Sequence, residues 1–163
     1  GFWVQRLWKD GAVMGFRALL AGAEPFQADG AYRPDLKGIF LYRGEHRPLV
    51  LEQIIQGVEA QSRKVQARLV LLDEIGGIEL MQEGFMQPLG RILTGGKPCV
   101  GVLKSRENLL GMVERKGLDK SCLLLHGQLE ELLRARGVLV DFTRERSPWV
   151  EQQFRAYLGQ TLS

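Results

Sequence analysis

The chain has 163 residues, of which 45% are hydrophobic and 25% are charged, a composition that excludes a disordered or fibrous protein. Its 22 basic and 19 acidic residues leave a net charge of +3, too balanced to indicate nucleic-acid or membrane binding by charge alone. We find no secretion signal and no apolar stretch that could cross a bilayer, and therefore expect a single cytoplasmic domain over residues 1–163 with a substantial core.

The N-terminal segment predicts a β-hairpin. Phe2 to Trp8 and Ala12 to Leu20 are β-prone runs on either side of Lys9-Asp10-Gly11, and Asp-Gly between such runs is typical of a hairpin turn. Aromatic side chains in a hairpin most often pack across the strands. A nucleic-acid-binding surface is the alternative, and it requires four side chains exposed on one face: Trp3, Arg6, Trp8 and Lys9.

The next segment predicts a loop, a short strand, a turn and a helix. Ala21 to Leu36 is rich in Gly and Pro, Gly38 to Arg43 is a short apolar run, and Gly44 to Pro48 suits a turn. The apolar residues of Leu49 to Arg63 recur at the spacing of one helical face, and Pro48 suits the first turn of that helix.

A chemically informative stretch follows at Arg68 to Leu80. The continuous apolar run of Leu69 to Leu72 suits a strand that is covered on both faces, as in a parallel sheet. Asp73 and Glu74 come where this strand would end, and the carboxyl ends of strands are where α/β sheets bind ligands. An Asp at this place can hold Mg²⁺ through water, and a neighbouring Glu can orient an attacking water. A buried strand that ends in two solvated acids is the alternative interpretation.

A second helix–strand pair comes next. Leu80 to Thr94 has one apolar helical face, but Gly84 and Pro88 predict a kink or a helix that begins near Gln87. Pro98 to Leu103 predicts another buried strand, which ends at Lys104. Since parallel strands end at one rim, Lys104 would share the rim with Asp73 and could contact a phosphate group, although a solvated lysine is the simpler interpretation.

The remaining elements are predicted from shorter patterns. Ser105 can cap a helix that ends before Gly117, and the last helix begins at Ser147-Pro148. Between them we expect two strands and one short helix: Ser121 to His126, Val138 to Phe142, and Gln128 to Arg136. The alternation of strands and helices from Gly38 onward favours an α/β fold with a mostly parallel sheet flanked by helices, preceded by the hairpin.

A longer motif specifies the fold further. The string Asp73-Glu74-Ile75-Gly76-x-x-Glu79-Leu80 resembles the DEIG-x-x-EL Walker B signature of the nucleoside-triphosphatase family first described in thermophiles, which has a cancer-related human member. Gly1-Phe2 and Gly15-Phe16 resemble the paired GF motifs of its hairpin, and the similarity extends to about Ser105. The resemblance implies a P-loop fold, Mg²⁺ as cofactor and hydrolysis of nucleoside triphosphates such as ATP and GTP.

The phosphate-binding loop of that family, GxxxxGK followed by Ser or Thr, lies upstream of the first GF pair, and the printed sequence contains no such loop. We expect an upstream segment to supply this loop together with a strand beside Leu69 to Leu72; the alternative is that another strand fills that position. In an active enzyme, Asp73 would bind Mg²⁺ through water, Glu74 would orient the hydrolytic water, and Lys104 would contact phosphate. A non-hydrolysing binding or regulatory module and a nucleic-acid-binding protein are the other two hypotheses, and the oligomeric state is left open.

Overall fold

The computed structural model describes residues 1–143 and 145–162 of the chain. The strands are β1 (Phe2–Lys9), β2 (Ala12–Leu20), β3 (Asp29–Ala31), β4 (Ile39–Tyr42), β5 (Glu45–His46), β6 (Val70–Ile75) and β7 (Cys99–Leu103). The helices are α1 (Pro48–Ser62), the 3₁₀ turn η1 (Ile78–Met81), α2 (Glu83–Thr94), α3 (Arg106–Lys116), α4 (Ser121–Arg136) and α5 (Ser147–Leu162). None of the described helices is long and apolar enough to cross a membrane.

The α/β class is confirmed, but the sheet is mixed rather than mostly parallel. The described residues form seven strands in the order β5-β4-β2-β1-β6-β7, with β3 beside β1. Pairs β1–β3, β1–β6 and β6–β7 are parallel, whereas β1–β2, β2–β4 and β4–β5 are antiparallel. The antiparallel pairs β1–β2 and β4–β5 follow from two-residue connections, since hairpins join neighbouring antiparallel strands while parallel strands need a longer crossover.

The predicted N-terminal hairpin is confirmed. The turn between β1 and β2 places Asp10 at φ 52° and Gly11 at φ 76°, a backbone region that Asp and Gly tolerate and that matches the twist of the two strands. Strand β1 also lies beside β6, where a separate upstream strand was expected. The two strands share one paired position, Phe2 with Leu72, so another strand of this chain does lie next to β6.

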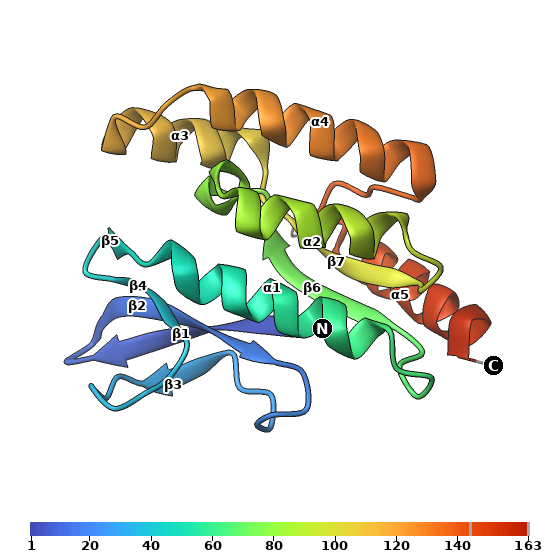
Figure 1. Ribbon diagram of the computed structural model, residues 1–163, viewed down its shortest axis with the longest axis horizontal. Coiled ribbons are helices and arrows are strands. Elements are labelled where there is room, and N and C mark those ends of the chain that lie inside the picture. The colour runs from blue at the N-terminus through green and yellow to red at the C-terminus, as the bar shows by residue number, and fades with distance from the viewer. Residues whose placement is uncertain (144, 163) are drawn as a thin grey trace.

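The main core lies between the sheet and the helix pair α1 and α2, which Figure 1 shows side by side over β6. Helix α1 turns Leu51, Ile55 and Val58 toward the sheet, and α2 turns Phe85, Leu89 and Ile92 inward. These side chains meet the buried face of β1 and β6, including Phe2 and Leu72. Each fully buried side chain of this kind contributes roughly 1.5–3 kcal/mol, so this layer holds the strand that carries Asp73 and Glu74.

Two of the predicted boundaries are wrong in ways that bear on the site. Strand β6 continues to Ile75, so Asp73 and Glu74 lie inside its last part rather than after it. Helix α2 begins at Glu83 rather than near Gln87, and Pro88 lies inside it. A further expected loop, Ala21 to Leu36, contains the short strand β3.

The predicted strand Ser121 to His126 is also wrong, because these residues form the first part of α4. Its buried side chains are Cys122, His126 and Leu129, which follow the i, i+4, i+7 spacing of one helical face. Val138 to Phe142, the other predicted strand, has no regular secondary structure. The helices Arg106–Lys116 and Ser147–Leu162 begin where the capping residues predict, and Ser105 Oγ accepts a hydrogen bond from Asn108 N.

Candidate functional site

The acidic pair lies at an irregularity in β6. The pairing with β7 runs from Val70–Cys99 to Leu72–Gly101 and then shifts to Ile75–Leu103, which leaves Asp73 and Glu74 in a bulge. Glu74 has φ 57°, which is uncommon for a residue other than glycine. Bulges of this kind redirect side chains near functional sites. Here the bulge places two successive carboxyl groups near the carboxyl end of β6, an interior strand between β1 and β7.

Lys104 and Glu74 are brought together across the ends of two parallel strands. Lys104 directly follows β7, and its backbone N–H donates to the carbonyl of Ile75 over 2.8 Å. Its ammonium forms an ion pair with Glu74 Oε1, with the lysine side chain 22% exposed and the glutamate side chain 42% exposed. The sequence places Lys104 on the rim with the acids, and the structure shows that its partner is Glu74.

Asp73 has a different environment from its neighbour. Its Oδ2 accepts a hydrogen bond from the backbone N–H of Val4 in β1 over 2.9 Å. Partial burial raises the pKa of Asp73 above its ordinary value; the Val4 hydrogen bond opposes this rise, and the charge of Glu74 adds to it. One carboxylate oxygen is therefore engaged by the neighbouring strand, while burial of the uncompensated charge favours a nearby cation.

Glu79 is a residue of this site that the sequence analysis gave no role. It is 7% exposed, and its Oε1 accepts a hydrogen bond from Gly77 N over 2.6 Å. Burial raises its pKa, which the hydrogen bonds from backbone N–H groups and the charge of Lys104 oppose. Glu79 thus stabilises the turn through Gly76 and Gly77 by accepting a hydrogen bond from Gly77 N. In the sequence, the only indication that Glu79 belongs to the site was its position in the same motif as Glu74.

His126 is the second residue of the site to which the sequence gave no function. It is 1% exposed in α4, and its Nε2 lies 2.7 Å from the carbonyl oxygen of Lys104. Its ring also lies against Gly76, where an added Cβ would be 3.2 Å from His126 Cδ2. Helix α4 therefore contacts the ends of both β6 and β7, a contact that no local sequence pattern could reveal.

A small pocket of about 60 Å³ lies beside Glu74, Glu79 and Lys104. It is lined by three charged and five apolar side chains: Glu74, Glu79, Lys104, Phe2, Val4, Phe40, Leu51 and Phe85. A water molecule needs roughly 10–15 Å³ of such volume, so the pocket can hold a few waters. Ligand pockets measure about 300–1,000 Å³, so this pocket by itself is too small for a nucleotide.

The donor set suits Mg²⁺ bound through water and a substrate rather than a closed metal cage. Among the described residues, no group of three or more His, Cys, Asp or Glu side chains could hold a metal ion. Proteins commonly bind Mg²⁺ with one or two carboxylates, several waters and substrate phosphates. Asp73, a partly buried carboxyl with one oxygen already held by Val4, fits this mode.

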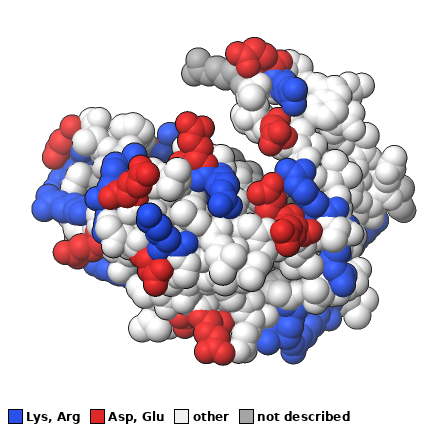
Figure 2. Space-filling model, turned by 90° about the horizontal axis from the view of Figure 1, so that it is seen from above, with Lys and Arg blue, Asp and Glu red and all other residues white. Residues whose placement is uncertain are grey.

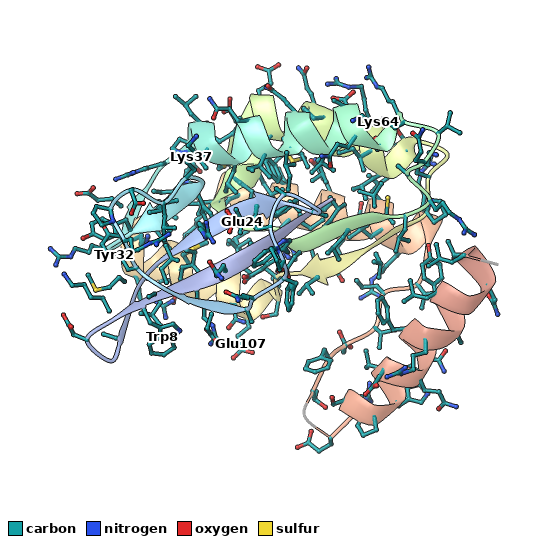
Figure 3. The ribbon with its side chains drawn as sticks, turned by 90° about the horizontal axis from the view of Figure 1, so that it is seen from below. Trp8, Glu24, Tyr32, Lys37, Lys64 and Glu107 are labelled. Carbon is teal, nitrogen blue, oxygen red and sulfur yellow. The ribbon has the colours of Figure 1, made fainter. Side chains whose placement is uncertain are left out.

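The hairpin does not form the exposed face that a nucleic-acid-binding surface required. Trp3 is 3% exposed and packs against Phe26 with 5.0 Å between ring centroids, whereas Trp8 is 37% exposed and donates to Asp29 Oδ1. Figure 3 shows Trp8 at the hairpin end of the molecule. Acidic and basic side chains are interspersed on the face shown in Figure 2, with no continuous basic surface. Packing against the connection between β2 and β3 therefore describes Trp3 better than base stacking.

The fold and this strand end define an α/β protein with paired acids near the carboxyl end of an interior strand. A family model described as NTPase matches residues 1–123 of the 163-residue chain. The chain therefore belongs to this NTPase family, and the match includes Asp73, Glu74 and Lys104 but ends before His126. Comparisons with curated proteins and with solved structures found no match.

Proposed function

We propose that this protein hydrolyses nucleoside triphosphates of the ATP or GTP class with Mg²⁺. The observation that carries the proposal is the water-sized pocket beside the bulge of β6, where Glu74, Glu79 and Lys104 converge. The family match supports a nucleotide partner, and the DEIG string lies within it. Because this pocket is too small for a nucleotide, we assign only the attacking water to it. The nucleotide itself would bind to further surface beyond the pocket.

Asp73 is the residue that would hold Mg²⁺, through a water molecule and its free carboxylate oxygen. When bound, the ion supplies positive charge that neutralises the phosphate oxygens. The Val4 N–H fixes the orientation of the Asp73 carboxyl from the neighbouring strand. Burial disfavours the charged carboxylate, so a cation at this place would compensate a cost that the fold already bears.

Glu74 would orient the hydrolytic water. Lys104 would form its ion pair with Glu74 as long as no phosphate is bound. The left-handed backbone of Glu74 directs its carboxyl toward the pocket, where the ion pair with Lys104 engages one oxygen, Oε1. The second oxygen can accept a proton or a hydrogen bond from water in the pocket. The ammonium of Lys104 lies close enough to shift from the carboxylate to a γ-phosphate, which carries more negative charge.

The substitution Glu74→Gln tests this proposal, because it preserves shape and removes the carboxylate that orients water. In the full-length natural protein, whose mass should be measured first, we expect kcat for Mg-nucleotide hydrolysis to fall roughly 10²–10⁴-fold. Glu114→Gln in α3 is the matched control, since Glu114 is exposed and is not among the residues that line the pocket. Full activity in Glu74→Gln would contradict the role of Glu74, whereas no turnover in the natural protein would contradict hydrolysis and favour a binding or regulatory module.

A further inference from the structure

His126 occupies an unusual position for a polar side chain, inside the packing of α4 against the site. It is 1% exposed, and its Nε2 lies 2.7 Å from the Lys104 carbonyl oxygen. Because a carbonyl oxygen only accepts hydrogen bonds, Nε2 carries the hydrogen and donates it. The same ring closes on Gly76 at the end of β6. A single side chain therefore lies against the residue that follows each strand, Gly76 after β6 and Lys104 after β7.

The other ring nitrogen of His126 shows that a histidine at this position has an energetic cost. Nδ1 of His126 is buried and has no hydrogen-bond partner among the described residues. A buried polar atom without a partner destabilises the fold, and such an atom in a native protein calls for an explanation. A leucine would fill this part of α4 without that cost, as Leu125 and Leu129 do nearby. The donor at Nε2 is what histidine supplies and leucine does not.

We propose that His126 is a positioning residue, which fixes Lys104 so that its ammonium meets Glu74. This inference rests on the proposed function, and His126 lies beyond the residues of the family match. The backbone of Lys104 is held on both sides: its N–H donates to Ile75 O, and its carbonyl accepts from His126. The lysine side chain is a flexible four-carbon stem, so the place of its ammonium depends on how firmly its backbone is fixed.

His126 would act on Lys104 and Glu74 through the ends of β7 and β6 rather than through contact with substrate. Without the donor, the Lys104 carbonyl loses its partner and the connection from β7 to α3 can shift. A displacement of about 1 Å at a catalytic group can lower a rate by as much as 10²-fold. We therefore expect His126 to influence kcat through the Glu74–Lys104 pair, and to leave KM almost unchanged.

Three substitutions separate the donor from the packing of the ring. His126→Phe keeps a ring against Gly76 but lacks the donor, and His126→Leu lacks the donor with a smaller side chain. His126→Gln places an amide N–H near the position of Nε2. In the full-length natural protein we expect the Phe and Leu variants to lose roughly 10- to 100-fold in kcat, and the Gln variant to stay close to wild type. Melting curves for all three confirm that each variant is folded.

Two measurements distinguish positioning from a general structural role. The first is a double-mutant cycle with Lys104→Met: if His126 acts through Lys104, adding His126→Phe to that variant causes no further loss. The second needs no activity: the ¹³C chemical shift of the Glu74 side-chain carboxyl, measured by NMR in wild type, His126→Phe and Lys104→Met. We expect His126→Phe to move this shift toward the value in Lys104→Met, and His126→Gln to restore it.

The outcomes separate this inference from the proposed function. If the Glu74 shift responds as expected but no variant hydrolyses nucleotides, His126 positions Lys104 and the hydrolytic function is wrong. If the Glu74 shift and kcat are unchanged in folded His126→Phe and His126→Leu, the positioning role is overturned. Equal losses in the Phe, Leu and Gln variants, or additive losses in the cycle, also overturn it, because the ring or the general packing would then be responsible.

Discussion

At the scale of single residues, Asp73 shows how a partly buried carboxyl group can lower stability. Partial burial raises the pKa of its carboxyl, so the folded protein holds this proton to a higher pH than the unfolded chain does. Between the two pKa values, folding takes up a proton, and the contribution of Asp73 to stability falls as the pH rises through that window. At neutral pH the fold therefore bears the cost of a partly buried charge.

We predict that Asp73→Asn raises the free energy of unfolding at pH 7. The amide oxygen can still accept the hydrogen bond from Val4, while the charge that burial and Glu74 disfavour is gone. The gain should shrink as the pH falls toward the ordinary pKa of 3.8, because the wild-type carboxyl is then protonated as well. Urea unfolding between pH 7 and pH 4 measures this difference.

Asp35→Asn is the matched control for that measurement, since Asp35 is 75% exposed and lies 3.8 Å from Arg33. Surface pairs of this kind contribute about 0–1 kcal/mol, so this control should change little with pH. A neutral-pH loss of stability in Asp73→Asn would mean that the charge itself stabilises the fold, contrary to the direction of its pKa.

Residues at the strand ends could be predicted from the sequence, whereas those that brace them could not. Asp73, Glu74 and Lys104 each follow an apolar run, and the parallel pairing of β6 and β7 places Glu74 beside Lys104 as that pattern indicates. Their chemical roles remain predictions. His126 comes from a helix 22 residues after Lys104, and its contact depends on how α4 packs, which local patterns do not encode.

At the scale of elements, the turn after β6 requires glycine for two independent reasons. Gly76 has φ 98°, a backbone conformation that side chains with a Cβ rarely adopt. A Cβ at this position would also lie 2.7 Å from Leu103 Cδ1 and 3.2 Å from His126 Cδ2. The turn is therefore fixed by strand β7 and helix α4 together.

We predict that Gly76→Ala destabilises the protein by roughly 1–3 kcal/mol, the usual cost of a strained backbone position. Gly90→Ala is the matched control: Gly90 lies in α2, nothing is within 4 Å of an added Cβ, and alanine should stabilise that helix by about 0.5–1 kcal/mol. Chemical denaturation of both variants gives opposite signs if the turn is built as described. A neutral Gly76→Ala would show that β7 and α4 can move away from the turn.

The wrong prediction for Ser121 to His126 has a physical cause at this same scale. A run of four apolar residues, Cys122 to Leu125, is too short for periodicity to distinguish a buried strand from part of a helix. The helical spacing of the buried residues in fact continues from Cys122 through His126 to Leu129. The existence of strand β6, by contrast, was predicted correctly because acids and glycines follow its apolar run, although the strand ends at Ile75 rather than before Asp73.

At the scale of the whole molecule, the chain has a densely packed part and a loosely attached one. Helices α1 and α2 lie on the sheet and each have four buried residues, whereas α5 has none. Figures 1 and 3 show α5 beside β7, away from α1. The hydroxyl of Tyr157 lies 3.4 Å from the Cys99 carbonyl oxygen, a long contact that adds little.

The strand order of the mixed sheet is also a property of the whole molecule, and the sequence could not predict it fully. The hairpin and the β6–β7 pair each follow from local patterns, but the order that joins them depends on β1 lying between β2 and β6. That arrangement joins Phe2 to Leu72 and Val4 to Asp73 across about 70 residues of chain, a separation that loop-closure entropy tolerates but no local pattern specifies.

We predict that hydrogen exchange separates α5 from the rest of the molecule. Local opening requires less free energy where few apolar side chains are buried, so the amides of α5 should exchange much faster than those of α1, which buries Leu51, Ile55 and Val58. Mass spectrometry of peptides from both helices in the same sample provides the internal control. Protection of α5 equal to that of α1 would contradict the prediction, and would mean that Trp149 and Phe154, both exposed here, are covered in solution.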